Sequence, residues 1–140
     1  MNIAQVVQSS VAPVFLLTGV AATLSVLTNR LARVVDRARI LEDRLESQPA
    51  RRGALLADLG VLARRARYIY AAISMCAIAA LLVALVVVSL FADAFLGVEV
   101  AKAIALLFVG AMLCLAVAYI AFLIEVRIAI AALRIGIPLK

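Results

Sequence analysis

Three long stretches without a charged side chain constrain this chain more than any other feature. They cover residues 1–29, 68–92 and 103–124 of the 140-residue sequence. About 20 consecutive apolar residues are enough for a helix to cross a bilayer. The stretches are rich in Ala and Leu and lack the apolar/polar alternation of a membrane strand. We therefore expect an all-α membrane protein with three transmembrane helices, at about residues 11–28, 68–92 and 103–124.

Overall composition excludes an ordinary soluble domain. The sequence is 68% hydrophobic and has a mean hydropathy of +1.20, whereas soluble domains are nearer half apolar. A water-soluble fold of this size does not have enough polar groups to cover so much apolar surface. The length suffices for one domain, and we expect residues 1–140 to form a single membrane domain.

The distribution of positive charge predicts the orientation in the membrane. Residues 29–67 hold ten arginines and five acidic residues, and the tail after residue 124 also carries a positive excess. The connection between the second and third spans has Lys102 as its one basic residue. Because Lys and Arg near span ends mark the cytoplasmic side, we expect the N-terminus outside and the C-terminus inside. No basic residue precedes Arg30, so the first stretch is expected to be a retained span and not a signal peptide.

Apolar residues alternate at spacings of three and four on both sides of a break at residues 47–49, which is typical of a heptad seam. Folding the chain antiparallel about a turn from Pro49 to Gly53 would pair Leu41 with Leu59 and keep the register. We therefore expect the first two helices to extend into an antiparallel cytoplasmic helical hairpin over residues 29–67. The alternative is two separate amphipathic helices on the membrane surface. The seams are Leu17, Val20, Leu24, Leu27, Leu31, Val34, Ala38, Leu41 and Leu45, then Leu55, Leu59, Leu62, Ala66, Ile69, Ile73, Cys76 and Ala80.

A polar face on the first helix predicts the function. Thr18, Ser25 and Asn29 lie roughly opposite the seam, and Arg33 and Arg37 follow on the cytoplasmic extension. A single chain would leave this face toward lipid, so we expect a homo-oligomer whose first helices line an ion channel. The alternative is a non-conducting scaffold or assembly factor. In that case the Arg-rich hairpin would bind an acidic protein partner or the headgroups of anionic membrane lipids.

Glu125 ends the third span, at the same depth as Arg30 and Arg67. A carboxylate at this depth favours an arginine partner over lipid, so we expect an ion pair between Glu125 and one of these two arginines. The segment that follows is apolar, with two arginines one heptad apart. It predicts an interfacial C-terminal helix over residues 125–137.

Enzymatic chemistry is not expected. The sequence contains no His, the commonest general base and metal ligand. Cys76 and Cys114 are isolated inside predicted spans, which is typical of packing residues. No phosphate-binding loop or nucleophile motif occurs, so we expect no catalytic residue, cofactor or metal. Nucleic-acid binding is also disfavoured, because the arginines are interleaved with acids and no aromatic platform accompanies them.

Two segments resemble the signature of a known family. They are SVAPVFLLTGV at residues 10–20, which contains Pro13, and TNRLARVVDRAR at residues 28–39. Both resemble segments of a family of small three-helix bacterial membrane proteins that is catalogued only as a domain of unknown function. The resemblance implies three spans and a bacterial inner-membrane location. It implies no activity.

Overall fold

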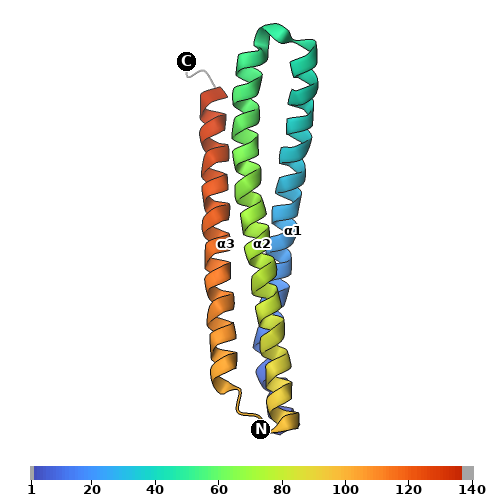
Figure 1. The fold of residues 1–140 in the computed structure, drawn as a ribbon, viewed down its shortest axis with the longest axis vertical. Coiled ribbons are helices and arrows are strands. Elements are labelled where there is room, and N and C mark those ends of the chain that lie inside the picture. Colours follow the sequence, from blue (N-terminus) through green and yellow to red (C-terminus); the bar gives the residue numbers. More distant parts are fainter. Residues whose placement is uncertain (1, 137–140) are drawn as a thin grey trace. The chain divides into compact units, whose positions relative to one another are not determined.

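The computed structural model describes residues 2–136, and these residues form three long helices without any strand (Figure 1). The elements are α1 (Ile3–Ser47), the short 3-10 helix η1 (Pro49–Arg51), α2 (Arg52–Leu96) and α3 (Ala101–Gly136). Each of the three long helices is long and apolar enough to cross a membrane. The prediction of an all-α chain with three such helices is confirmed.

The helices are longer than a membrane span requires. α1 and α2 have 45 residues each, which corresponds to about 68 Å at 1.5 Å per residue. The hydrocarbon core of a bilayer is about 30 Å thick. The predicted spans at residues 11–28 and 68–92 are therefore internal segments of α1 and α2, and each helix continues well beyond its span.

α3 contains both segments that were expected in the C-terminal region. The predicted span at residues 103–124 and the predicted interfacial helix belong to one helix of 36 residues, without a break at Glu125. The run of helix-forming Ala, Leu and Ile residues gives no reason for one there. Residues 137–140, including the end of the predicted interfacial helix, lie outside the described residues.

Two reciprocal hydrogen bonds cap the start of α1, and the helix continues past Pro13. The Gln5 amide donates to Asn2 Oδ1 over 2.9 Å, and the Asn2 amide donates to Gln5 Oε1 over 3.2 Å. This arrangement satisfies donors that the first helical turn leaves unpaired. Pro13 lies inside α1, so the segment before it is the first part of the same helix.

Both connections are shorter than predicted. Gln48 precedes η1, which starts with Pro49, and α2 begins at Arg52. Gly53 is thus inside α2 and not part of the turn, because Pro49 already redirects the chain. At the other connection, Gly97 has a φ of 63° and its amide donates to Asp93 O over 3.1 Å. This left-handed C-cap, which glycine adopts without steric cost, ends α2 at Leu96.

The helices contribute to two compact units. The first contains the described residues up to 25 and residues 74–118, and the second contains residues 26–73 and the described residues from 119 on. In the first unit, Val6, Val86 and Leu90 form a buried cluster against which Phe91 and Leu107 pack.

The core of the second unit follows the predicted seams. α1 and α2 run in opposite directions from the turn (Figure 1). Their most buried residues recur every seven positions, namely Val34 and Leu41 on α1 and Leu55, Leu62 and Ile69 on α2. A seven-residue repeat keeps one stripe of a helix facing its neighbour. The arginines of this region therefore occupy the remaining surface, apart from two that reach α3.

Candidate functional site: a buried carboxylate between two arginines

The periodicity of α3 places a carboxylate inside the second unit. Glu125 lies seven residues after the buried Ala118 and four after the buried Ala121. These spacings put the three side chains on one face of a helix. The small alanines permit close helix approach, and Glu125 has an exposed fraction of 0%. A buried carboxylate requires charged partners or hydrogen bonds.

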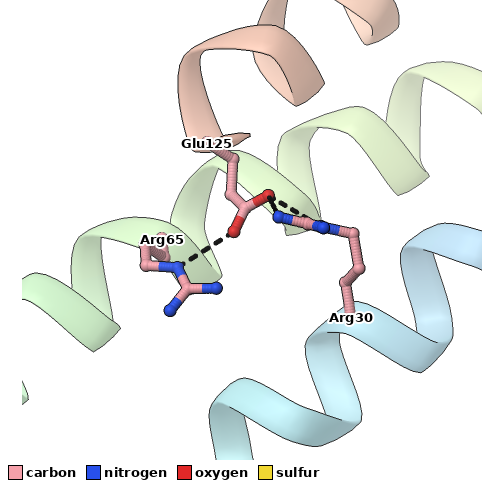
Figure 2. A network of polar contacts seen from close by, with 3 residues as sticks. All are labelled: Arg30, Arg65 and Glu125. Carbon is pink, nitrogen blue, oxygen red and sulfur yellow. Dashed lines mark hydrogen bonds and ion pairs between the residues drawn. The ribbon is translucent and has the colours of Figure 1, made fainter. Parts of the chain in front are cut away.

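Two arginines from two other helix segments supply those partners (Figure 2). Arg30 on α1 donates from Nε to Glu125 Oε2 over 2.9 Å, and its Nη2 lies 2.7 Å from the same oxygen. Arg65 on α2 donates from Nε to Glu125 Oε1 over 3.0 Å. Each carboxylate oxygen is therefore held by a different arginine, and the cluster connects all three helices within the second unit.

An aromatic ring supports the Arg30 side of the cluster. The Arg30 guanidinium carbon lies 5.4 Å from the centroid of the Phe122 ring, one turn before Glu125 on α3. A cation over an aromatic face gains about 0.5–1 kcal/mol where water is accessible. The Phe122 ring therefore packs against the Arg30 guanidinium and adds to the contacts that hold it near Glu125.

The cluster is not electrically neutral. One carboxylate meets two guanidinium groups, whose side chains remain 29% exposed for Arg30 and 22% exposed for Arg65. Arg65 reaches Glu125 through Nε (Figure 2). The site thus carries an excess positive charge.

A groove of about 390 Å³ adjoins the cluster at Arg65. All three helices line it within the second unit, with a mixture of charged and apolar side chains. The charged residues are Arg37, Asp58 and Arg65, and the main apolar residues are Leu41, Leu62 and Leu133. Such a surface favours an amphiphilic anion over a purely apolar ligand.

The predicted pore-lining residues are all exposed in the single chain. Thr18 donates its hydroxyl to Val14 O over 3.3 Å, which is the local bond that small hydroxyls commonly form in helices. Arg37 differs from the others because it lines the groove beside Arg65. The candidates are Thr18, Ser25, Asn29, Arg33 and Arg37.

The α1 surface that leads to Thr18 is more apolar than the polar-face prediction implied. A groove of about 330 Å³ in the first unit is lined by Val11, Val14, Phe15 and Thr18, together with Phe91 of α2. Val11 and Phe15 lie on the same helical face as Thr18 by their spacing of seven and three. The polar part of this α1 face therefore begins at Thr18, and the part before Thr18 is mainly apolar.

Sequence reasoning placed Arg30 beside Glu125 and missed Arg65. Arg67, the other predicted partner, is exposed, and no ion pair of Arg67 is present in the described part of the chain. The buried seam residues of α2 could have predicted Arg65 as the second partner of Glu125. Arg65 lies three residues after the buried Leu62 and four before the buried Ile69, whereas Arg67 lies on the opposite side of α2.

The described residues include no group of three or more His, Cys, Asp or Glu side chains arranged to hold a metal ion. Cys76 is buried and Cys114 is half-buried, and neither forms a disulfide.

Three long apolar helices of this kind fit a multi-pass membrane protein. Comparison with protein families then gives a specific match, which covers residues 10–135. The chain belongs to the DUF2721 family, whose description is "protein of unknown function". The family resemblance inferred from residues 10–20 and 28–39 is thereby confirmed. No curated protein and no solved structure matches the chain significantly.

Proposed function

We propose that the protein is a homo-oligomeric integral membrane protein in which the α1 helices of several subunits surround an ion-conducting path. The supporting observation is the two-sided character of α1. Its seam residues, such as Leu27 and Val34, are buried within the chain, while Thr18, Ser25 and Asn29 are exposed. Contact between copies would remove this polar face from lipid, where membrane helices associate through small and polar residues.

The proposed path has an apolar half and a basic half. Val11 and Phe15 would form the apolar part, and hydrophobic constrictions gate ion flow by excluding water. Asn29 and Arg33 would line the other end, where the positive field of Arg33 favours anions. Arg37 lines the groove with α2 and α3 residues, so Arg33 is the main basic residue of the path.

The oligomer and the conduction are tested separately. We expect native mass spectrometry in mild detergent to give a single oligomer of four or more subunits. In planar bilayers, Arg33→Glu should change the sign of the reversal potential under a salt gradient, because the field at the path reverses. Arg64→Glu makes the same charge change on an exposed residue of α2 and should leave the reversal potential unchanged. A monomer or dimer, or currents that both variants alter equally, would contradict the proposal.

The proposed orientation places the N-terminus outside a bacterial inner membrane, with the α1–α2 turn and the C-terminal end of α3 in the cytoplasm. Its support is the concentration of arginines in residues 29–67. With the two native cysteines replaced by alanine, a cysteine at Gln48 should react with a membrane-impermeant maleimide only after the cells are permeabilised. A cysteine at Val98, which is exposed between α2 and α3, should react in intact cells. The reverse labelling pattern would invert the orientation.

The second candidate is a non-conducting scaffold whose hairpin binds an acidic protein or anionic lipid. The observation that favours it is the exposure of the arginines in residues 29–67, because eight of the ten are exposed and only Arg30 and Arg65 are half-buried. Absence of current from a purified oligomer, together with binding that weakens as salt increases, would favour this function. The exposed arginines are Arg33, Arg37, Arg39, Arg44, Arg51, Arg52, Arg64 and Arg67.

A further inference from the structure

The groove beside the Glu125 cluster combines two features that the channel proposal does not use. It has two arginines, Arg37 from α1 and Arg65 from α2, and apolar side chains from all three helices. Leu133 of α3 is 67% exposed although it lines this groove. An occupant of the groove would thus meet positive charge and uncovered apolar surface together.

Arg65 is already positioned for an anion. Its Nε donates to Glu125 Oε1 over 3.0 Å, so one hydrogen bond already orders the side chain before any ligand arrives. The hydrogen bond to Glu125 uses Nε (Figure 2), and no hydrogen bond from a terminal nitrogen of Arg65 is present among the described residues. Arginine donors in a fixed plane suit the oxygens of a phosphate, and little side-chain freedom is lost on binding when the group is already ordered.

The opposite directions of α1 and α2 bring the guanidinium groups of Arg37 and Arg65 toward the same level. Side chains on a helix lean toward its N-terminus. Arg37 therefore leans from the hairpin toward the α1 span, and Arg65 leans from the α2 span toward the hairpin. With Glu125 at the membrane boundary, the two guanidinium groups approach one another in the headgroup layer, which is about 5–7 Å thick on each side of the bilayer.

We propose that this groove binds the headgroup of one anionic phospholipid, with its phosphate between Arg37 and Arg65. Leu41, Leu62 and Leu133 lie on the turn side of these two arginines, so they border the headgroup on its cytoplasmic side. Asp58 lines the same groove and opposes the phosphate, so it limits the affinity and disfavours a second anion. The proposal rests on the proposed orientation in the membrane and is independent of ion conduction.

The test measures lipid adducts on the delipidated protein by native mass spectrometry, with phosphatidylglycerol and phosphatidylcholine added at equal concentrations. We expect preferential binding of phosphatidylglycerol. Arg37→Gln should weaken it about fivefold, from about 1 kcal/mol per basic residue near an anionic surface. Asp58→Asn should strengthen it by a similar factor. Arg39→Gln, which removes the same charge from an exposed residue outside the groove, should have no effect.

Opposite effects of Arg37→Gln and Asp58→Asn support the site, because misfolding would weaken binding in both variants. Equal binding of the two lipids, or equal losses in Arg37→Gln and Arg39→Gln, would overturn it in favour of nonspecific attraction. Complete competition by millimolar inorganic phosphate would overturn it in favour of a free-phosphate site. Reversed maleimide labelling refutes the orientation, whereas these lipid measurements in detergent bear on the groove alone.

Discussion

Replacing Glu125 with glutamine is expected to destabilise the protein by about 3 kcal/mol, which is the lower end of the range for breaking a buried ion pair on one side. The carboxylate is fully buried between Arg30 and Arg65, and its loss leaves two guanidinium groups facing one another. The partial exposure of both arginines moderates the effect, because water solvates part of each charge. Thermal unfolding in mild detergent, followed by circular dichroism, measures the change.

Two controls separate the ion cluster from a general charge effect. Glu99→Gln removes the same charge from an exposed residue between α2 and α3 and should leave the unfolding temperature unchanged. The triple variant Glu125→Leu, Arg30→Met, Arg65→Met should recover most of the lost stability, because apolar residues often replace a buried ion network without loss. A triple variant as unstable as Glu125→Gln would contradict the electrostatic explanation.

Leu41→Asp should have an effect on the order of 3–5 kcal/mol, because it removes a buried leucine and places a carboxylate among apolar seam residues. Leu41 is 3% exposed, whereas its neighbour Ile40 is 46% exposed. Ile40→Asp introduces the same charge one residue away and should change the stability by less than about 0.5 kcal/mol. The comparison is made by chemical unfolding of both variants in the same detergent.

This pair of variants also tests whether the hairpin stands away from the membrane. Two separate helices lying on the bilayer would bury their apolar face in lipid and would not depend on contact between α1 and α2. Leu41→Asp would then weaken the contact of this helix with the bilayer surface and leave the proposed oligomer intact. Loss of the proposed oligomer in Leu41→Asp but not in Ile40→Asp is the result expected for a packed hairpin.

Repeated patterns made most of the architecture predictable. The uncharged stretches located the three helices because the low polarity of a bilayer leaves few other arrangements for such runs. The seams predicted which side of α1 and α2 is buried, since every residue from Leu31 to Ile69 assigned to a seam is buried or half-buried. Helix ends were less predictable. Gly53 was assigned to a turn and is helical, and α2 continues to Leu96, beyond the predicted end of the second span at residue 92. A glycine or an acidic residue near a helix end is compatible with both states.

The sequence predicted how far along each helix the site residues lie, but not on which side of α2 the partner of Glu125 lies. Counting residues from the span ends placed Glu125, Arg30 and Arg67 at one level, and two residues along a helix change that level by only about 3 Å. The same two residues rotate a side chain by about 200°. Arg65 faces α3 and Arg67 does not, so the choice between them required the direction of the seam. The groove depends on how three segments distant in sequence pack, which no local pattern specifies.

The position of the acid on the last helix has a consequence for biosynthesis. Arg30 and Arg65 are translated before Glu125, so the third helix enters the membrane when both of its charge partners are already present. An acidic side chain at the end of a span is unfavourable in lipid until it is paired. We therefore expect insertion of α3 to depend on prior folding of α1 and α2. A nascent chain whose hairpin has not folded would retain an unpaired Glu125 at the end of this span.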